Sequence, residues 1–144
     1  MSQQRTLTLK AETKQRGFPL SGRVRGFTVS VDEPQLLGGT DRAPNPLEYL
    51  LLSQAGCLSI VIGMLAEKRK LRLEEVSVEA SSNFELEGFL AGESVGLREI
   101  RLKVGLRSDE DLGTLRSLVE EAERVCPVRN TLSAKLHIEV ERLQ

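Results

Sequence analysis

The segment from Asn45 to Lys70 constrains the fold most strongly, because it predicts a long helix that is apolar on nearly all sides. Asn45 is a favoured N-cap residue, Pro46 suits the first helical position, and Glu48 follows Asn45 by three residues, as in a capping box. Only four polar residues interrupt positions 47 to 65. Because a helix of this kind has to be buried on most sides, we expect a central core helix that the rest of the chain covers.

A membrane span is the alternative interpretation of the same segment. Glu48, Ser53 and Gln54 crowd its first half, and the part from Cys57 to Leu65 alone is too short to cross a bilayer. The pattern therefore favours a core helix, and we expect no association with a membrane.

Length and composition narrow the class of protein. The 144 residues suit a single domain, 1–144, with a core of its own. Lys and Arg number 20 against 21 Asp and Glu, and with one Tyr, four Phe and no Trp there is little basic or stacking surface for nucleic acid. The first ten residues contain no apolar signal-peptide core, so we expect a cytoplasmic protein.

The residues before the central helix predict two strands. Alternating apolar residues predict half-buried strands at Thr6–Glu12 and Arg23–Val31. Thr13–Gly22 contains glycine and proline and predicts a loop between them. Asp32–Pro44 predicts a second loop, in which the Gly38-Gly39 pair supplies a backbone conformation that side chains forbid.

Two strands and a helix are expected next. A third strand begins at Val76, Glu87–Glu93 predicts a hairpin turn, and Leu97–Leu106 predicts a fourth strand. Ser108 and Asp111 predict a capping box that opens a second helix. Apolar residues then continue at helical spacing.

The chain is expected to close on a strand. Pro127 disfavours helical geometry at the preceding residue and is expected to end the second helix at Cys126. Ser133–Leu143 predicts the last strand, with His137 on its outward face. Strands grouped in hairpins beside separate helices predict an α+β fold rather than a doubly wound sheet.

The two cysteines are the candidate functional residues. Two buried structural cysteines are the ordinary interpretation of Cys57 and Cys126. A metal site is disfavoured, because two thiols and one outward histidine do not supply four ligands at a recognisable spacing. The functional interpretation is a peroxidatic thiol with a resolving partner, in which a thiolate attacks a peroxide and the resulting sulfenic acid condenses with the second thiol.

Neither cysteine is activated by its expected position. Cys57 lies among apolar residues in the middle of a helix, and Cys126 lies at a helix C-terminus, where the helix dipole disfavours negative charge. A cation near Cys57 is therefore expected. The N-terminal residues offer Arg16, Arg23 and Arg25, and Arg129 is the candidate nearest Cys126 in sequence.

Three motifs together resemble the OsmC/Ohr family, which comprises osmotically induced and organic-hydroperoxide-resistance proteins. They are NP-x-E-YLL…AGC-L in the first helix, the preceding GG pair, and CPVRNTL after the second helix. The resemblance implies antiparallel sheets wrapped around a long central helix in an intertwined homodimer, with the active site at the subunit interface. It also implies reduction of organic hydroperoxides by a thiol, and regeneration by a dithiol such as dihydrolipoamide. It implies no metal and no tightly bound cofactor.

The family's functional residues map onto this chain by position. Cys57 resembles the peroxidatic cysteine and Cys126 the resolving one, while Arg16 falls at the position of the family's arginine, with Arg23 and Arg25 as alternatives. The well-studied peroxidases carry a glutamate directly after Asn-Pro that holds this arginine, but here that residue is Leu47. Glu48 lies about half a helical rotation from Cys57, so capping is its expected role. The chain therefore resembles the looser OsmC-like branch.

The sequence leads to a function hypothesis with two rivals. We expect a homodimeric thiol-dependent peroxidase in which Cys57 and Cys126 lie close enough to form a disulfide within one subunit. One rival is a dimeric module that binds a hydrophobic ligand and has redox-inert cysteines. The other is thiol or sulfur-transfer chemistry with a different electrophile.

Overall fold

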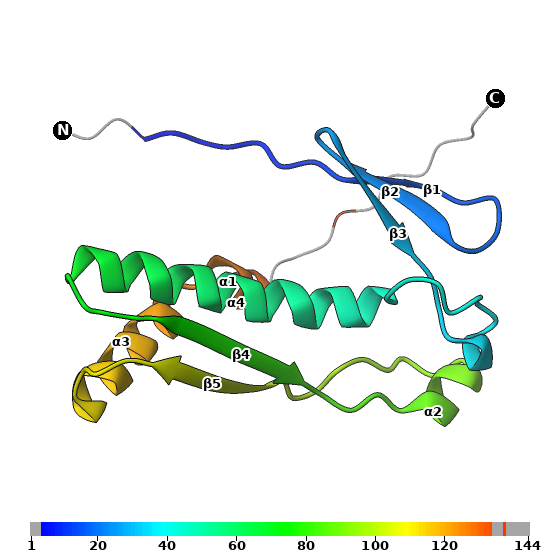
Figure 1. The fold of residues 1–144 in the computed structure, drawn as a ribbon. Helices are drawn as coiled ribbons and strands as arrows, with labels where there is room; N and C mark the ends of the chain where they lie inside the picture. Colours follow the sequence, from blue (N-terminus) through cyan, green and yellow to red (C-terminus); the bar gives the residue numbers. More distant parts are fainter. Residues whose placement is uncertain (1–3, 134–136, 138–144) are drawn as a thin grey trace. The chain divides into compact units, whose positions relative to one another are not determined.

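The computed structural model describes residues 4–133 and residue 137, and they adopt an α+β fold (Figure 1). In chain order the elements are β1 (Glu12–Lys14), β2 (Leu20–Val24), β3 (Phe27–Val31), the 3-10 helix η1 (Gln35–Leu37), α1 (Pro46–Lys68), β4 (Glu75–Ser81), α2 (Leu86–Leu90), β5 (Arg101–Arg107), α3 (Leu112–Val125) and α4 (Pro127–Thr131). The chain divides between Leu50 and Leu51 into two compact units. The single domain expected over 1–144 stays a prediction.

The N-terminal unit contains a three-stranded antiparallel sheet in the order β1-β2-β3. The single strand predicted at 23–31 is wrong, because β2 and β3 form a hairpin in which Val24 pairs with Phe27. Arg25 and Gly26 make the two-residue turn, and Arg25 has a φ of 55°, the left-handed conformation that such turns require. An arginine there is an unusual turn residue, which is why the sequence pattern concealed the hairpin.

The first strand and the first loop also differ from the prediction. The strand predicted at 6–12 is wrong over 6–11, because β1 begins only at Glu12, and Leu7 and Leu9 are exposed. The expected loop at 13–22 shortens to residues 15–19, because Lys14 still pairs with Ser21 across β1 and β2.

The loop from Asp32 to Pro44 is organised around a buried carboxylate. Asp32 is fully buried and accepts hydrogen bonds from the backbone N–H groups of Glu33, Thr40 and Arg42 and from the Thr40 hydroxyl. Burial raises the pKa of Asp32, but these hydrogen bonds together outweigh that effect and hold the pKa below its ordinary value. Gly38 adopts a φ of 86°, so the predicted backbone role of the glycine pair is confirmed there. Gly39 is required for a different reason, because a Cβ at that position would lie 2.1 Å from the Glu33 carbonyl oxygen.

The start of α1 matches the predicted capping box. The Asn45 side chain accepts from the Glu48 N–H at 2.8 Å, and the Glu48 carboxylate accepts from the Asn45 N–H at 2.9 Å. The Tyr49 hydroxyl donates to the Ser30 carbonyl oxygen at 2.6 Å and ties the first turn of the helix to β3. These bonds fix where the helix begins.

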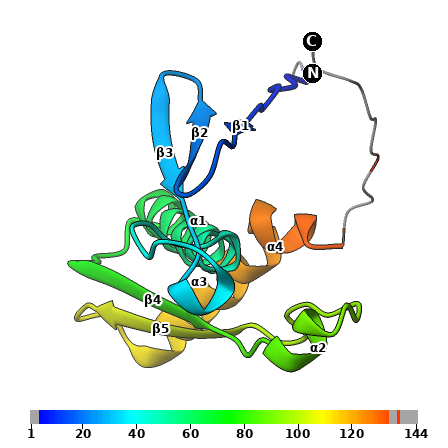
Figure 2. The same cartoon turned by 90° about the vertical axis from the view of Figure 1, so that its right-hand side faces the viewer.

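The second unit packs two helices against the β4–β5 hairpin. Its buried cluster contains Leu58, Ile62 and Ala66 from α1 with Leu118 and Ala122 from α3. Alternate residues of β4 and β5 are half-buried and pack against this cluster, as the alternating sequence predicts. In Figure 2 α1 lies on one side of the β4–β5 hairpin.

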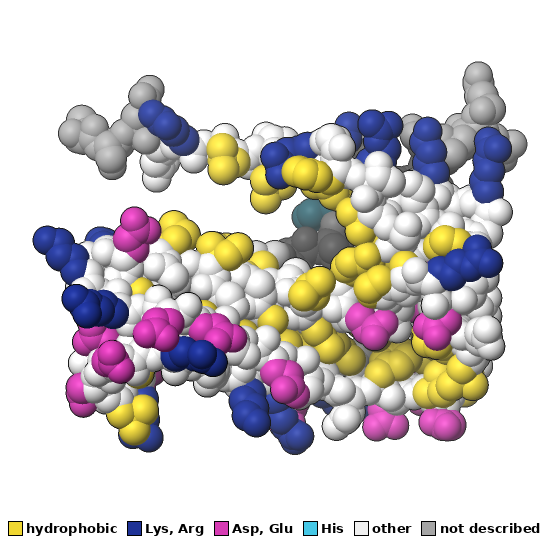
Figure 3. Space-filling model, in the orientation of Figure 1, with side chains coloured by type: hydrophobic (Ala, Val, Ile, Leu, Met, Phe, Trp, Pro, Cys, Tyr) yellow, Lys and Arg dark blue, Asp and Glu magenta, His cyan; other side chains and the backbone are white. Residues whose placement is uncertain are grey.

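One flank of α1 is left uncovered within the described residues. The helix buries a stripe that includes Gln54 and Leu58, but Leu52, Ile60 and Met64 are 62%, 64% and 64% exposed. Hydrophobic side chains reach the surface along α1 in the space-filling view (Figure 3). By length and composition alone α1 could cross a membrane, but its buried stripe belongs to the core of the second unit.

The connection between β4 and β5 was wrongly predicted as a turn at 87–93. It is longer and contains the short helix α2, after which Gly92 adopts a φ of 81°. The fourth strand begins at Arg101 rather than at Leu97. A single helical turn leaves too little periodic pattern to be recognised from sequence.

The capping box predicted between Ser108 and Asp111 is wrong. Asp111 is itself the N-cap of α3 and accepts from the N–H groups of Gly113 and Thr114. The Ser108 hydroxyl instead donates to the Arg72 carbonyl oxygen and accepts from the Glu110 N–H. The predicted strand at 133–143 lies largely outside the described residues, although His137 is exposed, as expected.

Candidate active site

The structure brings Cys57 and Cys126 into contact. Both are free thiols, and their Sγ atoms lie 3.2 Å apart although the residues are 69 positions apart in sequence. Cys57 is half-buried on α1, and Cys126 is fully buried after α3. The predicted proximity of the two sulfur atoms is therefore confirmed. Because a disulfide bond is about 2.05 Å long, the pair could close through a shift of about 1 Å.

Cys126 is held at a sharp junction between two helices. Pro127 excludes helical geometry at the residue before it, so α3 ends at Val125 and Cys126 has φ −65° and ψ 114°. The predicted helix end is confirmed. Pro127 then begins α4, which the sequence analysis missed, and the Asn130 N–H donates to the Cys126 carbonyl oxygen at 3.1 Å.

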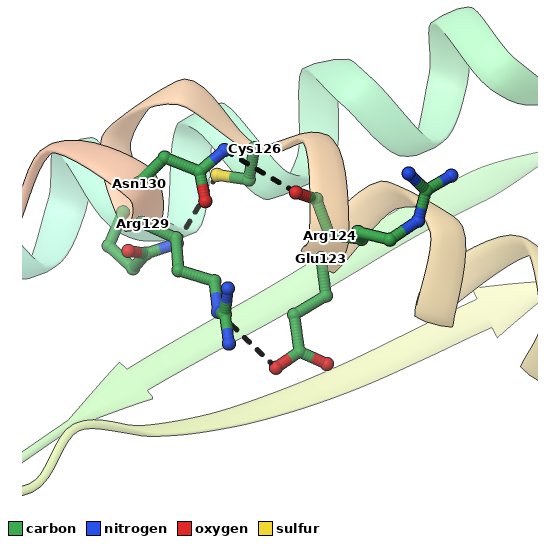
Figure 4. Close-up of polar contacts among 6 residues, drawn as sticks. Glu123, Arg124, Cys126, Arg129 and Asn130 are labelled. Atoms are coloured by element: carbon green, nitrogen blue, oxygen red, sulfur yellow. Dashed lines mark hydrogen bonds and ion pairs between the residues drawn. The ribbon is translucent and has the colours of Figure 1, made fainter.

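The side chain of Asn130 forms a second hydrogen bond across the junction between α3 and α4. Its amide donates to the Arg124 carbonyl oxygen at 3.4 Å, so Asn130 bonds both to Cys126 itself and to the end of α3 two residues before it (Figure 4). The Cys-Pro-x-x-Asn spacing therefore has a local structural role. It fixes the backbone that carries the Cys126 thiol.

Gln54 is a site residue that the sequence analysis counted only as a polar interruption. Its side chain is 3% exposed, and its Nε2 atom donates to the Cys126 Sγ atom at 3.5 Å. Gln54 precedes Cys57 by three residues, so both lie on the same face of α1. A buried amide three residues before a cysteine, in a helix that is otherwise apolar, was the available signal.

The two thiols have different electrostatic environments. Burial raises the pKa of the Cys57 thiol, and the hydrogen bond and negative charge of Cys126 raise it further. A hydrogen bond from the Val128 N–H lowers the pKa of Cys57, but by less. As expected from its apolar surroundings, Cys57 is the less readily ionised member of the pair.

Cys126 is more acidic than its place at the end of α3 suggested. Burial raises its pKa, but hydrogen bonds from the Arg129 N–H, the Cys57 thiol, the Gln54 amide and the Val128 N–H together lower it below the ordinary value. The expectation of a disfavoured thiolate considered α3 alone. It is wrong because Cys126 also precedes α4, whose first N–H groups face the sulfur.

The arginine candidates fall into two groups. Arg129 approaches Cys126 through its backbone, while its guanidinium lies 3.6 Å from the Glu123 carboxylate and points away from the sulfur (Figure 4). Arg16, Arg23 and Arg25 belong to the N-terminal unit and are exposed, with Arg25 stacked 4.9 Å from the Phe27 ring centroid. Which arginine approaches Cys57 stays a prediction.

Glu48 has a capping role instead of a place beside the thiols, and the described residues contain no metal-binding cluster. Glu48 is engaged in the capping box with Asn45, as expected of a helix cap. Among residues 4–133 and 137, no group of three or more His, Cys, Asp or Glu side chains is arranged to hold a metal ion. The groups that the structure brings together at this site are the two thiols and the hydrogen-bond donors around them.

Residues 39–141 match the family model described as OsmC-like protein. The chain belongs to the OsmC-like family. The match includes the central helix, both cysteines and the Cys-Pro-x-x-Asn motif, so the family resemblance noted in the sequence is confirmed. No curated protein sequence is significantly similar to the chain.

Solved structures of OsmC-like proteins have the same fold. An OsmC-like protein from Mycoplasma pneumoniae aligns with a TM-score of 0.73 at 17% identity, over 92% of this chain and 90% of that one. An organic hydroperoxide resistance protein from Elizabethkingia anophelis aligns with a TM-score of 0.72 at 20% identity, over 92% and 93%. Another, from Legionella pneumophila, aligns with a TM-score of 0.64 at 21% identity, over 91% and 93%. At these identities the likeness establishes the fold alone.

Proposed function

We propose that this OsmC-like protein is a thiol-dependent peroxidase that reduces organic hydroperoxides. The observation that supports this most is the 3.2 Å contact between two free thiols, of which one is half-buried and the other fully buried. A partly accessible thiol can meet a substrate, and a buried partner in contact with it can resolve the oxidised product. Two of the similar structures are named organic hydroperoxide resistance proteins.

The proposed reaction divides the work between the two cysteines. The Cys57 thiolate attacks the terminal oxygen of the hydroperoxide, the O–O bond breaks, and the alkoxide leaves and becomes an alcohol on protonation. Cys57 is then a sulfenic acid. The Cys126 thiolate attacks its sulfur, the S–S bond forms, and hydroxide leaves and is protonated to water. An external dithiol of the dihydrolipoamide type reduces the disulfide by exchange.

A cation remains necessary, because burial works against the Cys57 thiolate. We assign this role to Arg16, with Arg23 and Arg25 as the alternatives. Arginine suits the role better than lysine, since it keeps its charge in an apolar site and can hold a peroxide oxygen with a second N–H.

The protein is proposed to work as a homodimer in the cytoplasm. The exposed Leu52, Ile60 and Met64 are large apolar side chains on one helix, and a second copy of the chain would cover them. A reducing compartment would keep both cysteines available as thiols between turnovers.

A dimeric module that binds a hydrophobic ligand is the second candidate. Leu47 stands where the well-studied peroxidases carry an arginine-holding glutamate, and the raised pKa of Cys57 fits an inert thiol. An apolar groove of about 400 Å³ between β5 and α3, lined by Val104, Leu106 and Val119 among others, could accommodate such a ligand.

Steady-state turnover separates the two candidates. The reduced protein is mixed with tert-butyl hydroperoxide and dihydrolipoamide, and consumption of the dithiol is followed against a Cys57→Ser control. The peroxidase account expects dithiol oxidation that depends on hydroperoxide and is lost in the control. Rates equal to those of the control would instead leave the binding module as the better account.

A further inference from the structure

The two thiols of this chain are placed so that both can bind one small atom. The Sγ atoms of Cys57 and Cys126 lie 3.2 Å apart, and neither cysteine is in a disulfide. Cys126 is fully buried, and the Gln54 amide donates to its sulfur at 3.5 Å, so the position of this sulfur is fixed before any ligand arrives. Cys57 is half-buried, which leaves one side of the pair open to a small molecule. Little ordering is therefore needed for both sulfurs to bind at once.

The separation of the sulfurs limits which central atom fits between them. With bonds of about 2.3 Å, the length of a Zn–S bond, sulfurs 3.2 Å apart subtend an angle of roughly 90° at the atom that joins them. At the same bond length a tetrahedral zinc ion would hold two sulfurs roughly 3.8 Å apart, and an ion that binds them in a line would hold them roughly 4.6 Å apart. The smaller angle is typical of pyramidal trivalent arsenic, a soft centre that prefers sulfur ligands and forms bonds to sulfur of similar length.

The number of thiols narrows the ligand further. The sequence contains two cysteines, and among the described residues no group of three or more His, Cys, Asp or Glu side chains surrounds them. Inorganic arsenite carries three displaceable oxygens, so one of them would remain after it bound two thiols. A monosubstituted arsenical carries one permanent carbon group and two displaceable oxygens, so two thiols replace both oxygens.

We propose that the reduced Cys57–Cys126 pair is a binding site for monosubstituted trivalent organoarsenicals. This site goes beyond the proposed peroxidase and does not depend on turnover of hydroperoxide. Both cysteines have to be reduced for binding, because a disulfide leaves no free thiol to displace oxygen from arsenic.

The binding reaction needs no oxidant and no reductant. The Cys57 sulfur is the accessible one, so it bonds to arsenic first and displaces one hydroxyl group, which leaves as water with the Cys57 proton. The Cys126 sulfur displaces the second hydroxyl group, which leaves as water with the Cys126 proton. Two As–O bonds are exchanged for two As–S bonds, and arsenic stays trivalent. Because the second bond forms within the chain, both bonds have to break before the ligand can leave.

The test uses the reduced protein and phenylarsine oxide, which water converts to the monosubstituted dihydroxide. One equivalent is added in excess glutathione, and the native mass and free-thiol count are measured. We expect the mass to rise by one phenylarsine oxide less one water molecule and both free thiols to disappear. Adding the small dithiol 2,3-dimercaptopropanol should restore both thiols. Cys126→Ser can form only one As–S bond, so it should bind the probe roughly a hundredfold or more weakly.

The matched control combines Cys126→Ser with Ser59→Cys, which keeps two thiols in the chain but places them two residues apart on α1, on different sides of the helix. It should bind as weakly as Cys126→Ser alone. Equal binding by Cys126→Ser and the wild type would overturn the proposal, as would a wild type whose two thiols both stay free. If the variants fail to fold, the wild-type stoichiometry decides, because a probe that consumes only one thiol would also overturn it. No hydroperoxide is used, so the peroxidase activity is judged separately.

Discussion

The Sγ atoms of Cys57 and Cys126 lie 3.2 Å apart, yet the pKa of Cys57 is raised by burial while that of Cys126 is lowered by the hydrogen bonds around it. The more accessible sulfur is therefore the one that resists ionisation. A peroxidase built on this pair needs a proton acceptor for Cys57 and a cation that favours its thiolate.

Replacing each cysteine should give unequal results. Cys57→Ser should abolish hydroperoxide reduction, because Cys126, the only other cysteine in the sequence, is fully buried. Cys126→Ser should allow a single, slower oxidation and accumulate a sulfenic acid on Cys57, which dimedone labelling and peptide mass spectrometry would detect. A dimedone adduct found on Cys126 in Cys57→Ser, and none on Cys57 in Cys126→Ser, would reverse the two roles.

Removing the proposed cation should weaken the Cys57 thiolate. We expect Arg16→Ala to lower the alkylation rate of Cys57 at neutral pH by roughly tenfold or more, since a neighbouring guanidinium favours the charged form of a thiol. Alkylation is measured against pH in Cys126→Ser as the background. Arg23→Ala and Arg25→Ala are the parallel variants, and Arg5→Ala is an exposed control from the same part of the chain. If none of the three changes the rate, Cys57 has no dedicated cation and the binding module becomes the better account.

Introducing a charge on the uncovered flank of α1 should disrupt the proposed dimer. Ile60 is 64% exposed in the chain by itself, and Ile60→Glu would place a carboxylate in an apolar subunit interface. We expect subunit association to weaken by roughly a hundredfold or more, because burying an unpaired charge is costly. Sedimentation velocity at micromolar concentration measures this, with the exposed Lys68→Gln as control. A wild-type chain that sediments as a folded monomer would contradict the dimer itself.

Asp32→Asn should destabilise the loop that leads into α1. The folded state holds the pKa of Asp32 below its ordinary value near 3.8, so the ionised carboxylate contributes stability above that pH. This contribution is lost as the pH falls through 3.8 towards the lower folded pKa. We therefore expect the variant to melt at a lower temperature than the wild type at pH 7, and the difference to shrink in melting curves recorded below pH 4. A difference that stayed constant with pH would show that the charge of Asp32 is unimportant.

Local chemistry made part of this structure predictable. The Asn45–Glu48 capping box and the Cys126-Pro127 helix end depend on short-range geometry, and both were found from sequence. The β2–β3 hairpin was missed because its turn uses Arg25 in a left-handed conformation that arginine rarely adopts. The short helix α4 was missed because proline was interpreted only as the end of α3, not as the start of another helix.

The electrostatics of the site depended on contacts that sequence does not reveal. Nothing in the spacing of Gln54 indicates that its amide meets a sulfur 72 residues away, since that depends on how α3 and α4 pack on α1. The acidity of Cys126 likewise depends on backbone N–H groups that only the folded junction aims at the sulfur. The motifs identified which residue types matter, and the tertiary structure determined which hydrogen-bond donors surround each thiol.

The most direct test of the account is the mass and free-thiol count of the reduced protein after one equivalent of tert-butyl hydroperoxide. The account predicts that both free thiols of each chain disappear together and that the intact mass falls by two hydrogen atoms, as one intrachain disulfide forms between Cys57 and Cys126. An unchanged mass with both thiols still free would contradict the peroxidase. A gain of one oxygen atom with Cys126 still free would show that Cys126 does not resolve Cys57.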